Sequence, residues 1–135
     1  MPRNKDKSNF DLDINFGIKG EKHIINLFEG DGKVEVKTER DIWMTTGNLA
    51  FEIKGFEDRL SGISTTKATW WIHILSYNDK PIMHFCFNVA SLKKALKRLV
   101  KNKNAKIKKG GDKNYSTIIL APINKLLQEY YEVHS

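Results

Sequence analysis

Residues 34–54 read VEVKTERDIWMTTGNLAFEIK. Apolar and polar side chains alternate at both ends of this stretch, over 33–38 and 48–54, and such alternation is typical of strands with one buried face. The residues between these two segments predict a loop or frayed strand ends. We expect the two strands to pair as an antiparallel hairpin with a long connection.

Each of these strands carries a Glu-x-Lys unit on the face opposite its aliphatic residues. Glu35 and Lys37 form the first unit, and Glu52 and Lys54 form the second. One interpretation is a lattice of cross-strand salt bridges on a solvated face, each worth at most about 1 kcal/mol. The other is a cation site, because two or three carboxylates suffice for Mg²⁺ and a nearby lysine can stabilise charge on a phosphodiester.

A helix is predicted before the first strand, from about residue 15 to Glu29, after a flexible arm at 1–10. Apolar residues recur along it at helical spacing, and the Gly-Asp-Gly run at 30–32 is a strong stop signal. Glu21 lies on this apolar stripe. Burying a carboxylate costs several kcal/mol unless it is paired or binds a metal, so Glu21 either contributes to a site or reaches solvent or a lysine at the stripe edge.

The rest of the chain predicts six further elements. They are a short helix capped by Ser64–Thr66 and running to about 69, strands at 70–76 and 82–87, an amphipathic helix with Asn88 or Ser91 as its N-cap, a strand at 115–120 and a helix at 123–132. This order predicts an α+β or mixed α/β fold in a single domain over 1–135.

Composition excludes several classes of protein. The chain has 135 residues, of which 40% are hydrophobic and 29% charged, which is typical of a globular domain. No stretch approaches the roughly 20 apolar residues that span a bilayer, and the first ten residues do not resemble a secretory signal. The single cysteine, Cys86, excludes an intrachain disulfide and a Cys-rich zinc site. We therefore expect a soluble, cytoplasmic protein.

The net charge of +7 is unevenly distributed. Residues 88–109 carry nine lysines and arginines and no acid, while the remainder holds 14 basic and 16 acidic residues. Such a segment suggests a surface that faces a polyanion, although a solvated helix face gives the same pattern. The residues expected to contact nucleic acid are Lys93, Lys94, Lys97, Arg98, Lys101, Lys67 and, for base stacking, Trp43.

Several runs together resemble the PD-(D/E)XK nuclease superfamily. They are the helix with Glu21, the unit Glu35-Val36-Lys37, Thr46-Gly47-Asn48 leading to Phe51-Glu52, the run SGISTTKA at 61–68 and the Trp-rich strand after it. More narrowly, the chain is similar to small phage-type members related to Holliday-junction-resolvase-like and RecB-like nucleases. The resemblance spans roughly residues 12–76, and the runs at 110–112 and 119–122 also look like the end of such proteins.

The resemblance implies a restriction-endonuclease-like core, with a central mixed β-sheet flanked by helices, in a phage-encoded protein. It also implies an endonuclease that hydrolyses phosphodiester bonds in DNA with Mg²⁺, for which Mn²⁺ may substitute. Glu21, Glu35 and Glu52 would be the metal ligands and Lys37 the catalytic lysine. The family usually has an Asp on the strand before Glu-x-Lys, so either Asp31 or Glu52 completes the acidic set, and Lys54 is the alternative lysine.

Two other functions fit the same residues. A nucleic-acid-binding module with a degenerate nuclease fold would use the strand charges only as salt bridges. An interaction protein would use the basic helix on an acidic partner and would have little affinity for DNA. DNA is thus the expected partner, and cleavage of a branched DNA would in addition require a homodimer.

Overall fold

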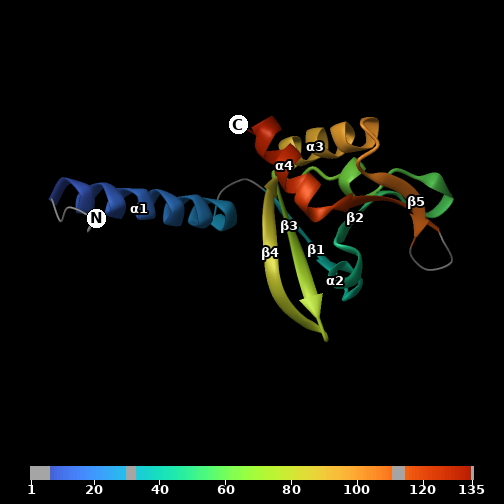
Figure 1. Cartoon of the computed structure of the whole chain (residues 1–135), viewed down its shortest axis with the longest axis horizontal. Helices are drawn as coiled ribbons and strands as arrows, with labels where there is room; N and C mark the ends of the chain where they lie inside the picture. The colour runs from blue at the N-terminus through green and yellow to red at the C-terminus, as the bar shows by residue number, and fades with distance from the viewer. Residues whose placement is uncertain (1–6, 30–32, 111–114, 135) are drawn as a thin grey trace. The chain divides into compact units, whose positions relative to one another are not determined.

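The computed structural model describes residues 7–29, 33–110 and 115–134. The chain divides into two compact units, Met1–Lys33 and Val34–Ser135, which we describe separately. The first unit contains α1 (Lys7–Glu29), drawn in blue in Figure 1. None of the helices in the described ranges is long and apolar enough to cross a membrane.

Helix α1 ends at Glu29, as its apolar stripe predicts, but it begins eight residues earlier than expected. Residues 7–10 are therefore helical and do not belong to a flexible arm. The prediction was late because the apolar stripe was traced only from Ile14, although Phe10 continues it at helical spacing four residues earlier. The rest of the predicted arm, residues 1–6, and the stop signal at 30–32 lie outside the described residues.

The second unit contains two three-stranded sheets (Figure 1). The first sheet has the order β1-β3-β4, in which β1 (Val34–Glu39) runs parallel to β3 (Trp70–Tyr77) and β3 runs antiparallel to β4 (Lys80–Asn88). The second sheet is antiparallel, with the order β2-β6-β5. Its strands are β2 (Asn48–Lys54), β6 (Ser116–Pro122) and β5 (Lys106–Gly110).

The predicted hairpin of the first two strands is wrong, because β1 pairs with β3 and β2 pairs with β6. The connection between them is a short helix, α2 (Ile42–Thr46), which ends at Gly47 in a left-handed conformation with φ +70°. Alternation along a strand identifies the strand but not its neighbour, and here both neighbours lie far along the chain. The two Glu-x-Lys units therefore lie on strands of different sheets.

The predicted short helix at 64–69 is also wrong. A single 3₁₀ turn, η2 (Gly62–Ser64), lies there, and another, η1 (Phe56–Asp58), follows β2. The Thr66 hydroxyl donates to Glu35, and it accepts a 3.2 Å hydrogen bond from the amide of Ala68. The Thr66 hydroxyl therefore connects the loop to β1 and does not cap a helix.

The amphipathic helix α3 (Val89–Lys101) and the last helix, α4 (Ile123–His134), lie side by side in Figure 1. The cap of α3 is Asn88, one of the two predicted residues, and its side chain accepts a 3.1 Å hydrogen bond from the amide of Ser91. The two helices pack their apolar residues into one core with both sheets. Its fully buried members include Leu49, Phe51, Trp71, Leu92, Leu96 and Leu126. In the described ranges the fold is thus α+β, with four α-helices and two three-stranded sheets.

Candidate functional site

Two carboxylates on one face of β1 contact β2 or the loop beside it, and a lysine lies between them along the strand. Glu35, Lys37 and Glu39 alternate along β1, so they point to the same side. Glu39 Oε1 accepts a hydrogen bond from the amide of Ala50 on β2, and Glu35 Oε2 accepts one from Thr66. The charge of Lys37 acts on Glu52 of β2. Although β1 and β2 belong to different sheets, Glu39 thus binds β2 directly and Glu35 binds the loop beside it.

Glu52 is the most strongly held acid of this group. The hydroxyl of Ser116 donates to its Oε1 at 2.6 Å and that of Ser61 to its Oε2 at 2.8 Å. These two hydrogen bonds, together with the positive charge of Lys37, lower the pKa of Glu52 in spite of its partial burial. Glu52 is therefore a carboxylate at neutral pH, which is the form that binds a cation.

One loop holds both strand acids. We call residues 61–66 the tether loop, because Ser61 at its start binds Glu52 and Thr66 at its end binds Glu35. Between them lies Gly62, with φ +56°, and a Cβ atom there would lie 2.3 Å from the backbone oxygen of Glu52. Only glycine allows the loop to approach β2 this closely, so the run SGISTT has a geometric role that its sequence alone does not reveal.

The two predicted lysines differ in what they face. Lys37 acts on Glu52, whereas the charge of Lys54 acts on Asp58. The pKa of Asp58 is lowered first by the hydrogen bond and charge of Lys109 and to a smaller extent by Lys54. A shift in the pairing of β2 with β6 lies between Glu52 and Lys54. Lys37 is therefore the lysine next to the strand acids.

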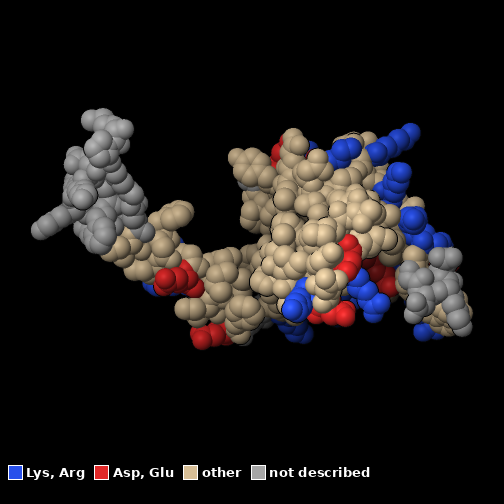
Figure 2. Space-filling view, turned by 60° about the horizontal axis from the view of Figure 1, so that its bottom comes forward, with Lys and Arg blue, Asp and Glu red and all other residues tan. Residues whose placement is uncertain are grey.

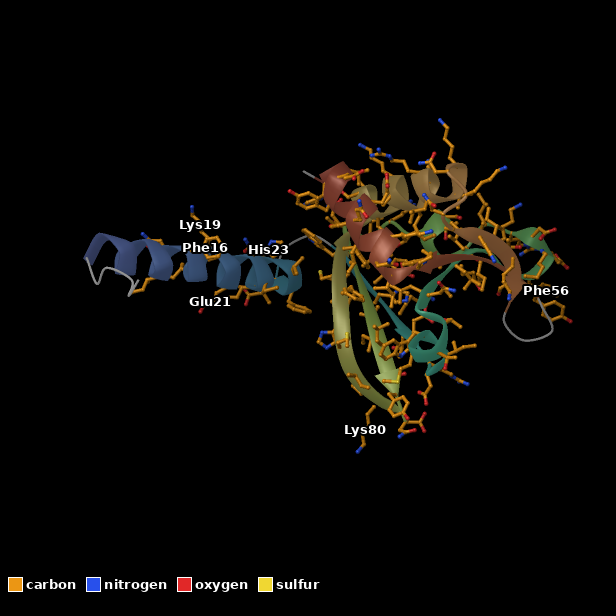
Figure 3. All side chains as sticks on the ribbon, in the orientation of Figure 1. Phe16, Lys19, Glu21, His23, Phe56 and Lys80 are labelled. Atoms are coloured by element: carbon orange, nitrogen blue, oxygen red, sulfur yellow. The ribbon has the colours of Figure 1, made fainter. Side chains whose placement is uncertain are left out.

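The two other predicted acids, Glu21 and Asp31, lie outside the described part of the second unit. Glu21 lies on α1, in the first unit, and Figure 3 shows its side chain projecting outward from the helix. Asp31 lies outside the described residues. Across the described ranges no three His, Cys, Asp or Glu side chains are grouped so as to hold a metal ion. Of the predicted metal ligands, the second unit holds Glu35 and Glu52, which both accept hydrogen bonds from hydroxyls of the tether loop.

The structure does not support contact between Trp43 and nucleic acid. Trp43 lies in α2, is only 8% exposed and donates a 2.6 Å hydrogen bond from its indole nitrogen to the carbonyl of Ser76. It belongs to the core, so the prediction that it stacks on bases is wrong. The position in a predicted loop was misleading, because that loop is a helix with an inward face.

A buried hydrogen-bond network that the sequence did not indicate supports the end of β1. The Nε2 atom of His73 lies 2.9 Å from Glu39 Oε1, and the indole of Trp71 donates to His73 Nδ1 at 3.0 Å. Since Nδ1 accepts, the ring proton is on Nε2 and is donated to Glu39. His73 is only 1% exposed. Glu39 continues the alternation of Glu35 and Lys37, and that was the only available signal.

The basic residues predicted to contact nucleic acid lie on α3, except for Lys67, which directly follows the tether loop. Figure 2 shows lysine and arginine side chains gathered on one side of the second unit. Lys94, Lys97 and Lys101 are exposed on α3, Lys93 is half-buried there, and Lys67 is exposed next to Thr66. Arg98 forms an ion pair with Glu129 at 2.7 Å, so part of its charge is neutralised.

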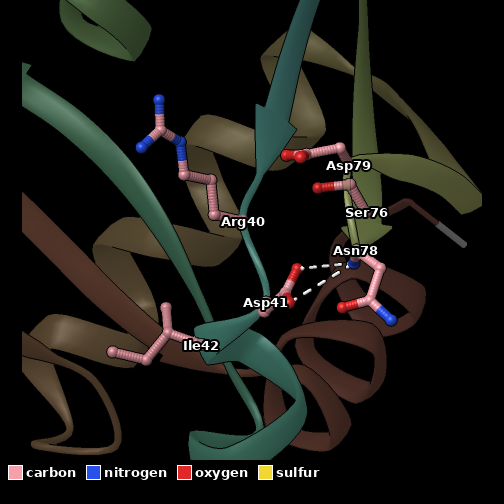
Figure 4. Close-up of a pocket in the computed structure, with 6 residues that line it drawn as sticks. All are labelled: Arg40, Asp41, Ile42, Ser76, Asn78 and Asp79. Carbon is pink, nitrogen blue, oxygen red and sulfur yellow. Dashed lines mark hydrogen bonds between the residues drawn. The ribbon is translucent and has the colours of Figure 1, made fainter.

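A polar hollow of about 510 Å³ lies at the C-terminal end of β1, where Arg40 and Asp41 follow Glu39 (Figure 4). The carboxylate of Asp41 accepts two hydrogen bonds from the amide of Asn78, at 3.1 and 3.3 Å. Arg40 and Asp79 also line the hollow. Charges of both signs and the bonds within the wall give it no preference for an anion or a cation.

Comparison of the chain with protein-family models, with curated proteins and with solved structures finds no match.

Proposed function

We propose that the protein is a Mg²⁺-dependent DNA endonuclease of the PD-(D/E)XK type. In this proposal Glu35 and Glu52 bind the cation and Lys37 is the catalytic lysine. The observation that carries the proposal is the ionised Glu52, which lies beside Lys37 and is joined to Glu35 through the tether loop. The mixed sheet with its parallel pair β1–β3 would form part of a restriction-endonuclease-like core.

The residues of the second unit fit a hard divalent cation. Mg²⁺ prefers oxygen ligands and usually binds one or two carboxylates while it keeps several waters. Thr66 engages one oxygen of Glu35, which leaves the other available, and each oxygen of Glu52 has a second lone pair beyond its serine. When bound, a divalent cation polarises the phosphodiester and lowers the pKa of its water ligand.

The side chains of this site have separate tasks. Ser61, Ser116 and Thr66 fix the orientation of the two carboxylates. The Lys37 ammonium stabilises the negative charge that develops on the phosphate oxygens, and it orients the attacking water. The exposed lysines of α3 bind backbone phosphates, which gives affinity that is independent of sequence and sensitive to salt.

The direct test is cleavage of DNA in Mg²⁺ or Mn²⁺ by the wild type and by Glu35→Ala and Lys37→Ala. Both variants should lose at least about 100-fold in rate, in line with the loss of one charge-stabilising group. Lys80→Ala is the matched control, since Lys80 is an exposed lysine at the start of β4 (Figure 3). Undiminished cleavage by both variants would refute the assignment.

A second candidate is a DNA-binding module without catalysis. The hydrogen bonds that Glu35 and Glu52 already make favour it, because hydroxyl groups alone can satisfy these carboxylates. This candidate predicts salt-sensitive DNA binding without cleavage in any divalent metal, and equal binding by the wild type and Glu35→Ala.

A further inference from the structure

Two exposed aromatic side chains form a pair near the candidate site. The ring centroids of Phe56 and Tyr115 are 5.2 Å apart and the rings are inclined at 80°, in an edge-to-face arrangement. Phe56 is 60% exposed and Tyr115 is 50% exposed. Figure 3 shows Phe56 projecting at the outer end of the second unit. Exposed apolar residues that stand singly are common, whereas a contiguous apolar patch often marks a site for a ligand or a partner.

The backbone holds Phe56 in a tight turn of unusual conformation. Glu57 and Asp58 follow it with φ values of +57°, although neither is glycine. Such residues persist only where the surroundings over-determine them, and they cluster at functional sites. Here the amide of Gly55 donates to the carbonyl of Arg59 at 2.8 Å, and Lys109 Nζ donates to Asp58 at 3.0 Å. The exposed ring of Phe56 is therefore presented by a fixed turn.

The chain also fixes the distance of this pair from Glu52. Phe56 follows Glu52 by four residues, which places their Cα atoms within about 14 Å at the maximum extension of about 3.6 Å per residue. Tyr115 precedes Ser116, whose hydroxyl binds Glu52. Because one DNA strand rises about 3.4 Å per nucleotide, the Cα atom of Phe56 lies within about four nucleotide steps of the Cα atom of Glu52.

The charges around the rings favour nucleic acid over an apolar protein segment. Lys54, Arg59 and Lys109 surround the turn, together with the acids Glu57 and Asp58. Arg59 pairs with Glu57 at 3.4 Å and Lys109 with Asp58 at 3.0 Å, so both acids are neutralised and a positive excess remains. Base stacking needs an exposed aromatic face and no hydrogen bond, and it tolerates any sequence.

We infer that Phe56 and Tyr115 form a platform on which an unpaired base of the DNA stacks beside the cleavage site. This inference rests on the proposed function for its substrate and adds a preference for DNA with a single-stranded segment, such as a flap or a branch, over continuous duplex. Bases within a duplex are stacked on one another and do not offer a face to the platform.

The test measures binding in EDTA, where no cleavage occurs. Single-stranded and duplex oligonucleotides that contain 2-aminopurine are titrated with the wild type, Phe56→Ala and Tyr115→Ala. We expect each variant to bind the single strand roughly 5- to 150-fold more weakly and to lose the fluorescence quenching of the stacked base. Duplex binding should be unchanged. Tyr115→Phe should bind as the wild type does, because it keeps the ring.

Two further variants distinguish base stacking at this pair of rings from a general loss of an exposed ring and from an apolar contact. Tyr131→Ala removes an equally exposed ring from α4, where Tyr131 is 72% exposed, and it should leave binding unchanged. Phe56→Leu keeps an apolar side chain but no aromatic face, so normal single-strand binding by this variant would show an apolar contact and overturn stacking. Equal loss of single-strand and duplex binding would also overturn the platform.

The outcomes distinguish this inference from the proposed nuclease function. If Lys37→Ala cleaves as the wild type does while Phe56→Ala loses single-strand binding, the catalytic assignment fails and the platform stands. If Lys37→Ala is inactive while both platform variants bind and quench normally, the platform fails alone.

Discussion

The hydroxyl of Ser116 donates a 2.6 Å hydrogen bond to Oε1 of Glu52, although 64 residues separate the two in the chain. The contact joins β6 to β2, which are antiparallel neighbours, and Ser61 completes it from the tether loop. Together the two hydroxyls lower the pKa of Glu52, with a further contribution from Lys37. The groups that lower the pKa of Glu52 therefore come from parts of the chain that lie far apart in sequence.

Ser116→Ala should raise the pKa of Glu52 toward its ordinary value, because the largest cause of the lowering is removed. A lowered pKa stabilises the fold above the pKa of the unfolded chain, and that stability is lost as pH falls through the folded value. The variant should therefore lose less stability on acidification, and the acid limb of any cleavage profile should move to higher pH. A carboxyl ¹³C NMR titration measures the pKa directly.

The matched control for this prediction is Ser64→Ala, since Ser64 lies in the same loop and is also half-buried. Its titration of Glu52 should equal that of the wild type. If Glu52 titrates identically in Ser116→Ala and in the wild type, the hydrogen bond from Ser116 does not set the pKa of Glu52.

Gly62→Ala should be more harmful than Gly47→Ala, although both glycines have a positive φ. An alanine in the left-handed region costs about 1–2 kcal/mol at either position. At Gly62 the added Cβ would lie 2.3 Å from the Glu52 carbonyl oxygen, whereas at Gly47 it would meet nothing within 4 Å. The clash should add about 1–3 kcal/mol in urea unfolding and disturb Glu52. Equal losses at the two positions would mean that the tether loop can move away from β2.

Local pattern was enough to predict much of the fold. Alternation identified β1 and β2, and the apolar spacing of α3 together with Asn88 fixed that helix and its cap. Pairing was not predictable, because a strand pattern contains no information about its neighbour. The hairpin prediction failed for this reason, since β2 pairs instead with β6 near the end of the chain.

The candidate site was predictable only in its charged residues. Glu35, Lys37 and Glu52 stand out as paired Glu-x-Lys units, but the hydroxyls of Ser61 and Ser116 are ordinary in sequence and meet Glu52 only through the fold. Trp43 shows the opposite error, since an aromatic residue in a presumed loop has its ring in the core.

His73→Ala should destabilise the protein by about 2–4 kcal/mol in urea unfolding. It leaves the Trp71 indole without its buried partner and Glu39 Oε1 with the Ala50 amide alone. An unsatisfied buried group costs about 1–3 kcal/mol, and the lost ring also leaves a cavity. His84→Ala, at an exposed position on β4, should change stability by less than about 0.5 kcal/mol. Similar small losses for both histidines would show that the network does not support the end of β1.

Lys97→Ala should weaken duplex binding and reduce the slope of log K against log salt by about 0.9, the value for one phosphate contact. Lys80→Ala, which removes an exposed lysine from β4, should leave both quantities unchanged. Anisotropy titrations of a labelled duplex between 50 and 200 mM salt measure both the affinity and the slope. The Debye length falls by about half over this range. Equal slopes for the wild type, Lys97→Ala and Lys80→Ala would show that Lys97 of α3 does not contact DNA.

The central claim is that Glu35 and Glu52 belong to one cation site. Calorimetric titration with Mn²⁺ tests it most directly, for the wild type, Glu35→Gln, Glu52→Gln and the exposed-acid control Glu57→Gln. Either site substitution should weaken Mn²⁺ binding by about tenfold or more, in line with the loss of one ligand charge, and the control should bind as the wild type does. Unchanged Mn²⁺ binding in both Glu35→Gln and Glu52→Gln would contradict it.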